Sequence, residues 1–283
     1  MEVKLLLTPI QLAEILLQKS TVIIDTRPSQ EYAVSHIPGA VNINEIFTYL
    51  ASSTSFGLSS LQSDFADLFG AAGISGTEQI VIYEDAMNSG YGQSCRGYFL
   101  LKYLGCSHVS ILHGGYKAWL AAQMPTTTEI PHQERKIFSL NINSSILVTT
   151  EQMLQALDNP EIIKLDVRDY DEWIGASSSP YGVDFCPRKG RIPGSVWIEW
   201  YRMMIPNSEI SMFRPVEEIL EICQSVGITP ESTVYVYCFK GSRAANTLIA
   251  LKEAGIKDVR NYFSSWNEWS RDFSLPIDAL FLP

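Results

Sequence analysis

Residues 238–243, "CFKGSR", bring a thiol, two cations and a glycine into one short segment. The thiolate is the reactive form of cysteine, and a free thiol with a pKa of about 8.5 is only a few per cent ionised at neutral pH. Three features favour the thiolate here: the inward backbone N–H groups of a tight loop, the positive end of a following helix, and two nearby cations. The same cup would hold an anionic head group. We therefore interpret Cys238 as a candidate nucleophile and the rest of the loop as candidate substrate-binding residues: Phe239, Lys240, Gly241, Ser242 and Arg243.

A catalytic cysteine commonly depends on a histidine partner. All four histidines precede the loop by more than a hundred residues and lie in the first half of the chain or just after it: His36, His108, His113 and His132. A Cys–His dyad would therefore have to form between the two halves of the chain, and we consider this alternative the weaker one.

The loop follows an apolar run and precedes a helical pattern. Short β-branched runs such as "TVIID" (21–25), "IVIYE" (80–84) and "TVYVYC" (233–238) alternate with helical patterns such as "SRAANTLIALKEAG" (242–255). Strands buried on both faces and separated by helices predict an α/β fold with a mainly parallel sheet flanked by helices. In such sheets the reactive groups gather at the carboxyl ends of the strands, and Cys238 is at such an end.

The chain repeats itself. In the same order, "VIIDTRPSQEY" (22–32) matches "IIKLDVRDYDEW" (162–173), "HIPGAV" (36–41) matches "RIPGSV" (191–196), and "GISGTEQIVIYE" (73–84) matches "GITPESTVYVYC" (227–238). The second copy carries about fourteen extra residues between its first two matches. The repeat predicts two tandem domains, residues 1–128 and 145–283, joined by a linker at 129–144.

The repeat also supplies an internal comparison for the loop. Glu84 falls in the first copy where Cys238 falls in the second, and the following "DAMNSGYGQSC" is longer and lacks Lys and Arg. If Cys238 served only packing, a similar residue would be expected in both copies. We therefore predict one catalytic copy and one inactive copy.

Composition indicates which kinds of partner and which cellular compartment to expect for this protein. A net charge of −10 and a pI near 4.9 argue against a nucleic-acid binder, which would present a broad basic face. No run of 18 apolar residues and no secretory start occur, so we expect a cytoplasmic protein without a membrane partner. Five cysteines without a CxxC pair suit reduced thiols better than a disulfide framework or a zinc site.

Taken together, these motifs resemble tandem-domain rhodaneses, the thiosulfate and 3-mercaptopyruvate sulfurtransferase family. The resemblance rests on "IIDTRPSQEYAVSHIPGAVNI" (23–43), the duplicated architecture, the six-residue cysteine loop and the closing "YFSSWNEW" (262–269). It implies that the Cys238 thiolate takes a sulfane sulfur from a small anionic donor and becomes a persulfide. The outer sulfur then passes to cyanide, a thiol or a protein acceptor, with no metal or organic cofactor. Attack of a thiolate on sulfane sulfur transfers no obligatory proton, so the lack of a local histidine agrees with this chemistry.

The loop residues bear on the identity of the sulfur donor. Lys240 resembles the loop of thiosulfate-type members, Phe239 fits neither donor type, and Arg243 resembles single-domain members rather than the Thr of many tandem ones. Glu172 falls where tandem members carry a substrate-binding Arg, which disfavours 3-mercaptopyruvate unless the nearby insertion supplies a cation. We therefore predict thiosulfate as the donor, with 3-mercaptopyruvate as the alternative, and the insertion's candidate cations are Arg188, Lys189 and Arg191.

Two further alternatives concern the class of protein. Phosphatases of this fold also place a Cys and an Arg around an anion, but their loop is one residue longer. Some rhodanese domains lack the cysteine and serve as binding modules, which describes the first copy better than the second.

Several other residues are predicted to be structural. We expect Asp25 with Arg27, and Asp166 with Arg168, to form ion pairs that fix loops. Trp266 and Trp269 are expected to be packing anchors, and Cys223 a small core residue on a helix. Cys95 is the one other cysteine that we consider as a solvent-exposed, reactive thiol.

Overall fold

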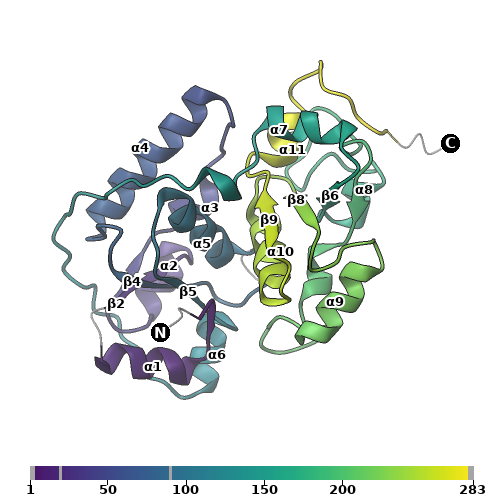
Figure 1. The fold of residues 1–283 in the computed structure, drawn as a ribbon. Helices are drawn as coiled ribbons and strands as arrows, with labels where there is room; N and C mark the ends of the chain where they lie inside the picture. Colours follow the sequence, from purple (N-terminus) through teal and green to yellow (C-terminus); the bar gives the residue numbers. More distant parts are fainter. Residues whose placement is uncertain (1–3, 19–20, 89–90, 280–283) are drawn as a thin grey trace. The chain divides into compact units, whose positions relative to one another are not determined.

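The computed structural model describes residues 4–18, 21–88 and 91–279, and within it the chain divides into two compact units. The first unit comprises residues 1–49, 59–143 and 205–213, and the second comprises residues 50–58, 144–204 and 214–283. Each unit is an α/β domain with one parallel sheet, as the alternation of apolar runs and helical patterns predicts (Figure 1).

The first unit has a five-stranded parallel sheet in the order β1-β5-β4-β2-β3. In Figure 1, α1 and α6 lie below its strands and α4 lies above them. Helix α1 begins at Pro9, and the hydroxyl of Thr8 before it accepts from the Gln11 N–H at 3.3 Å, as an N-cap does. The elements are β1 (Leu6–Leu7), α1 (Pro9–Gln18), β2 (Thr21–Asp25), α2 (Ser29–Val34), β3 (Ala40–Asn42), α3 (Glu45–Thr48), α4 (Ser55–Ala71), β4 (Gln79–Tyr83), α5 (Gln93–Leu104), β5 (Val109–Leu112) and α6 (Gly115–Ala121).

The second unit has a four-stranded parallel sheet in the order β7-β6-β8-β9. A single parallel bridge from Leu147 to Asn261 takes the place that the β1–β5 pair has in the first sheet. With that bridge the two sheets have the same order, which confirms the duplication. The elements are η1 (Ser144–Ile146), α7 (Thr150–Gln155), η2 (Ala156–Asp158), β6 (Ile162–Asp166), α8 (Tyr170–Trp173), β7 (Val196–Trp197), η3 (Trp200–Met203), α9 (Val216–Gln224), β8 (Thr233–Tyr237), α10 (Ser242–Glu253), β9 (Asp258–Asn261) and α11 (Ser265–Trp269).

Strand register brings the carboxyl ends of the central strands together. Asp25 of β2 pairs with Tyr83 of β4, and Asp166 of β6 pairs with Tyr237 of β8. Residues that follow these strands therefore meet at one edge of each sheet, which is the edge where side chains of parallel sheets gather for chemistry.

The predicted ion pairs are present at both of these edges. Arg27 Nη2 lies 2.7 Å from Asp25 Oδ2, and Arg168 Nη2 lies 2.6 Å from Asp166 Oδ2. In each copy the arginine also donates to a loop carbonyl, that of Ser35 or of Gly190, both at 2.8 Å. The prediction of loop-fixing ion pairs is thus confirmed.

The units do not follow the order of the sequence throughout. Residues 205–213 belong to the first unit, where the Phe213 N–H donates to Nε2 of the buried His113 at 2.9 Å. The Phe213 ring stacks on that imidazole with centroids 5.7 Å apart. Conversely, residues 50–58 belong to the second unit, where the Glu268 carboxylate accepts from Ser53 N and Ser53 Oγ at 2.7 and 2.6 Å.

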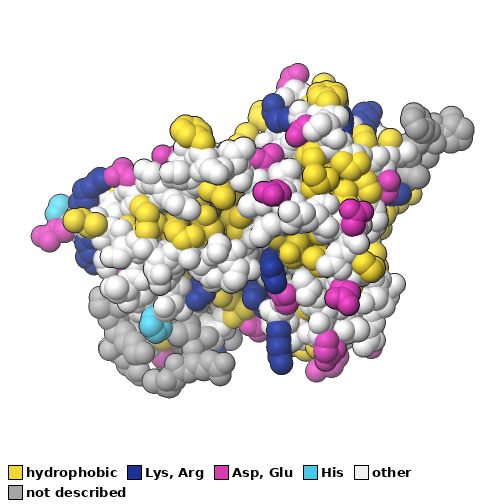
Figure 2. All heavy atoms as spheres, turned by 45° about the horizontal axis from the view of Figure 1, so that its top comes forward, with side chains coloured by type: hydrophobic (Ala, Val, Ile, Leu, Met, Phe, Trp, Pro, Cys, Tyr) yellow, Lys and Arg dark blue, Asp and Glu magenta, His cyan; other side chains and the backbone are white. Residues whose placement is uncertain are grey.

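The surface is mixed in character. On the face that Figure 2 shows, acidic and basic side chains are interspersed among polar and apolar ones. Across residues 4–18, 21–88 and 91–279, none of the helices has both the length and the apolar character needed to span a bilayer.

Candidate active site

Cys238 is the first residue after β8, and the loop ends where α10 begins at Ser242. The turn is possible because Gly241 has φ +85°, in the left-handed region. A Cβ at this position would lie 2.6 Å from the carbonyl oxygen of Phe263. The glycine is therefore required both by backbone conformation and by the closeness of the segment after β9.

Hydrogen bonds fix both the sulfur and the backbone of Cys238. The backbone N–H of Gly241 points at the sulfur, with N and Sγ 3.1 Å apart. The N–H of Cys238 donates to Ser265 Oγ at 3.1 Å, and its carbonyl accepts from the Trp266 N–H at 3.0 Å. Asn261 at the end of β9 adds a bond to the Gly241 carbonyl at 3.1 Å. The sulfur thus lies at the N-terminal end of α10 in a loop fixed by β9 and α11.

Arg243, predicted to bind substrate, lies in the first turn of α10 and is buried. Its Nη1 and Nη2 lie 2.6 and 3.1 Å from the two carboxylate oxygens of Glu172, and Nη1 also lies 3.0 Å from Asp169 Oδ1. Burial acts to lower the pKa of Arg243, but Glu172, Cys238 and Asp169 together outweigh it and raise that pKa well above its ordinary value. Arg243 is therefore a permanent cation bound by two carboxylates of the α8 region.

Phe239 and Lys240 are covered by aromatic rings from the extra segment of the second copy. The Tyr181 ring lies 4.9 Å from that of Phe239, and Phe185 meets Phe239 edge-on at 6.4 Å, centroid to centroid. Lys240 Nζ lies 5.6 Å from the Tyr181 centroid, and the residue is only 8% exposed. Sequence reasoning missed Tyr181 and Phe185, although their place in an aromatic-rich insertion beside the loop was a usable signal.

The three insertion cations serve that segment's own structure. The Arg188 guanidinium donates to four backbone carbonyls between Trp269 and Leu275, at 2.5–2.9 Å. Lys189 Nζ donates to the Ala176 carbonyl at 2.8 Å, and the Arg191 guanidinium lies 4.0 Å from the Trp173 ring centroid. Through these contacts the three cationic side chains hold the insertion in position.

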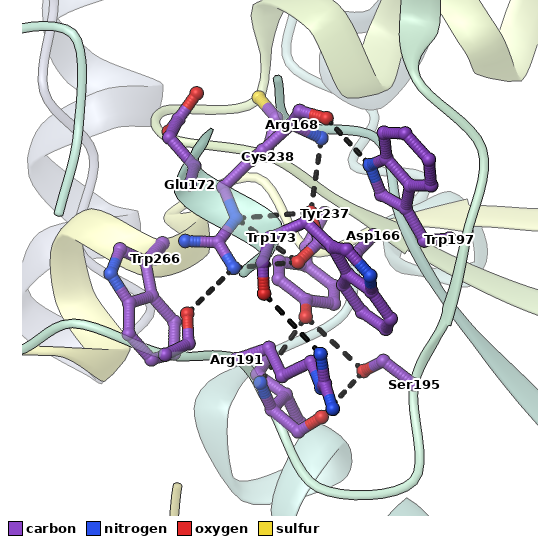
Figure 3. Close-up of polar contacts among 12 residues, drawn as sticks. Asp166, Arg168, Glu172, Trp173, Arg191, Ser195, Trp197, Tyr237, Cys238 and Trp266 are labelled. Atoms are coloured by element: carbon purple, nitrogen blue, oxygen red, sulfur yellow. Dashed lines mark hydrogen bonds and ion pairs between the residues drawn. The ribbon is translucent and has the colours of Figure 1, made fainter. Parts of the chain in front are cut away.

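A buried polar framework lies beneath the loop (Figure 3). Arg168, paired with Asp166, has its guanidinium 4.6 Å from the Trp266 ring centroid. The hydroxyl of Tyr237, the residue before the cysteine, accepts from the Ile192 N–H at 3.2 Å. Trp266 and Trp269 are fully buried, which confirms them as packing anchors.

Glu84 occupies in the first unit the position of Cys238, directly after the corresponding strand β4. Its buried carboxylate accepts from the Gln93 N–H at 3.1 Å and from Ser94 Oγ at 2.6 Å, at the start of α5. Burial raises the pKa of Glu84 to about 7, against opposing hydrogen bonds. A carboxylate thus takes the place that the sulfur has in the second unit. Two residues of the longer loop that follows, Ser89 and Gly90, lie outside the described residues.

The other four cysteines are buried and free of disulfide bonds. Burial raises the pKa of Cys106 and of Cys223 to about 12, which disfavours their thiolates. Cys223 is a core residue as predicted, and Cys95, for which exposure was considered, is fully buried on α5. Within residues 4–18, 21–88 and 91–279, no group of three His, Cys, Asp or Glu side chains is arranged to hold a metal ion.

Comparison with known proteins agrees with this architecture. Residues 8–122 and 149–272 each match the family described as "Rhodanese-like domain". The thiosulfate sulfurtransferase of Pseudomonas aeruginosa is 27% identical over 278 residues, covering 98% of both chains. That of Bos taurus is 30% identical over 242 residues, covering 85% of this chain and 79% of the bovine one. The solved wild-type structure of EanB shares the fold, with a TM-score of 0.83 and 23% identity, over 97% of this chain and 69% of that chain.

The family match covers both copies, and the repeated parallel sheets place equivalent residues at equivalent strand ends in each. The chain therefore belongs to the rhodanese family and carries two rhodanese-like domains in tandem.

Proposed function

We propose that the protein is a thiosulfate sulfurtransferase in which Cys238 carries the transferred sulfur as a persulfide. The observation that carries this proposal is the Cys238 sulfur at the start of α10, 3.1 Å from the Gly241 N–H and next in sequence to a lysine and an aromatic cover. Relatives that cover most of the chain are named thiosulfate sulfurtransferases, which supports the same choice.

The first half-reaction needs no proton transfer. The thiolate of Cys238 attacks the outer sulfur of thiosulfate, a new S–S bond forms, and the donor's S–S bond breaks so that sulfite leaves with the electron pair. The Gly241 N–H and the end of α10 stabilise the negative charge on the sulfur, and Lys240 binds the sulfonate of the donor. Phe239, covered by Tyr181 and Phe185, keeps water from the persulfide.

In the second half-reaction an acceptor attacks the outer sulfur of the persulfide. With cyanide the products are thiocyanate and the original thiolate, and a cellular thiol or a protein thiolate acts in the same way. Both steps move an electron pair between sulfur atoms or from carbon to sulfur. A histidine base is therefore unnecessary, in agreement with a loop that offers N–H groups and cations.

Thiosulfate is preferred over 3-mercaptopyruvate as the donor because the nearby cationic side chains already bind protein groups. Glu172 binds Arg243, and the Arg188, Lys189 and Arg191 side chains fasten the insertion. A donor that presents a carboxylate as well as a sulfur would need a further cation, whereas the compact sulfonate of thiosulfate needs only the loop.

The test is the mass of the protein. After incubation with thiosulfate the chain should gain one sulfur atom, and cyanide should remove it and release thiocyanate. Cys238→Ser should do neither, and uptake by that variant would disprove the proposed nucleophile. Parallel incubation with 3-mercaptopyruvate decides the donor, and faster uptake from it would contradict the preference for thiosulfate.

A further inference from the structure

The Cys238 loop has an anionic neighbour that its chemistry does not call for. Glu172, on α8, is only 2% exposed and binds both terminal nitrogens of Arg243, at 2.6 and 3.1 Å. Asp169, at the N-terminus of the same helix, adds a third contact at 3.0 Å. In Figure 3 the Glu172 carboxylate and the Cys238 sulfur point to the same side, away from the Asp166–Arg168 pair.

The first unit shows that this burial is not required by the fold. Glu31 occupies the equivalent position, as the third residue of α2, and is exposed. The first copy has no cation at the place of Arg243, because its loop lacks Lys and Arg. A carboxylate is buried at this position only in the copy that carries the thiol and the arginine.

We propose that Glu172 is a positioning and charge-setting residue for sulfur transfer. It fixes Arg243 beside the loop and offsets its positive charge. Sulfite can then leave the site, and the acceptor can discharge the persulfide. This inference rests on the proposed function. Each half-reaction must both bind an anion and release one, and an uncompensated buried arginine would favour binding at the expense of release.

The expected size of the effect follows from Coulomb's law. At an effective dielectric constant of about 20, a unit charge about 12 Å from an anion changes the binding of that anion on the order of tenfold, and a closer charge changes it more. Glu172→Gln should therefore lower the KM for thiosulfate and slow the discharge of the persulfide by cyanide, each by that order.

A direct readout uses two alkylating reagents of the same shape. Iodoacetate is an anion and iodoacetamide is neutral, and both react with the thiolate, which displaces iodide. The ratio of their rates at Cys238, followed by peptide mass mapping, cancels the thiolate fraction and reports the local potential. We expect Glu172→Gln to raise the iodoacetate-to-iodoacetamide ratio on the order of tenfold.

Two further variants make the test decisive. Asp169→Asn removes a charge but keeps a good N-cap, so it should fold and shift the ratio the same way by a smaller factor. Glu31→Gln is the matched control and should leave the ratio and the kinetics unchanged.

The ratio also separates this inference from the proposed function. A purely structural Glu172 would change both alkylation rates equally, and an unchanged ratio in folded Glu172→Gln and Asp169→Asn would overturn the inference. If Glu172→Gln does not fold, Asp169→Asn decides alone. Alkylation uses no sulfur donor, so a shifted ratio in a protein that takes no sulfur from thiosulfate would uphold the charge-setting role and reject the proposed activity.

Discussion

The backbone N–H of Gly241 lies 3.1 Å from the sulfur of Cys238, three residues earlier in the chain. This contact closes the loop around the sulfur. It depends on a left-handed glycine pressed against the Phe263 carbonyl, so the geometry at the thiol is set by a residue without a side chain.

Gly241→Ala should therefore lower activity by more than the strain of a left-handed alanine alone would predict. An alanine at φ +85° costs about 1–2 kcal/mol, and here its Cβ must also displace the Phe263 carbonyl, 2.6 Å away. We expect sulfur uptake from thiosulfate to fall on the order of a hundredfold, as for the loss of one oxyanion-hole donor. The control is Gly255→Ala, at φ +86° with nothing within 4 Å of its Cβ, measured by the same uptake and by urea unfolding. Equal losses of activity in the two variants would contradict a role for the Gly241 geometry.

Lys240 should contribute to donor capture more than to stability. Lys240→Ala is expected to raise the KM for thiosulfate on the order of tenfold, because a charge-assisted contact to the sulfonate is lost. Lys240→Arg keeps the charge and should recover most of the effect. Steady-state kinetics with varied thiosulfate check this, and a KM unchanged in Lys240→Ala would remove the lysine from the proposed mechanism.

His113 gives the first unit a defined response to acid. Its buried Nε2 accepts the Phe213 N–H, and burial lowers the pKa of His113 from 6.5 to about 4. Between these values the unfolded chain binds more protons than the folded one, so stability falls as pH drops from about 6.5 to about 4. The full effect is about 3 kcal/mol. Urea unfolding of wild type and His113→Gln across this range should show the wild-type slope reduced in the variant, and identical slopes would contradict the assignment.

Glu84 should act in the opposite direction. Burial raises the pKa of Glu84 from 4.5 to about 7, so the folded state holds a proton that the unfolded state has lost. Stability therefore falls as pH rises from about 4.5 to about 7, by about 3 kcal/mol in all. In Glu84→Gln this loss should disappear, which urea unfolding of the wild type and the variant across this pH range can measure. A variant that loses stability with rising pH as steeply as wild type would show that Glu84 does not titrate as described.

The fold and the place of Cys238 at a strand end were predictable because they depend on short-range pattern and on the repeat. "TVIID" and "TVYVYC" contain β2 and β8, and the alignment of Glu84 with Cys238 holds because both residues directly follow their strands. The ion pairs Asp25–Arg27 and Asp166–Arg168 were predictable for the same reason, since their partners are two residues apart.

The surroundings of the loop were not predictable in the same way. Glu172 and Arg243 are 71 residues apart, and their pairing depends on how α8 packs beside α10. The cover of Phe239 by Tyr181 comes from an insertion without a counterpart in the first copy, so the repeat gave no guide to its conformation. Cys95 is buried because nearly the whole of α5 is buried, and this depends on tertiary packing that the local sequence does not show.

The exchange of residues 50–58 and 205–213 means that the two repeats in the sequence are not the two bodies in space. A proteolytic cut or a gene truncation between the repeats would leave the N-terminal fragment without Phe213 against His113, and the C-terminal fragment without Ser53 against Glu268. Each fragment would expose the surface that the missing segment covers. A fragment that holds one repeat alone would therefore lack part of its own compact unit.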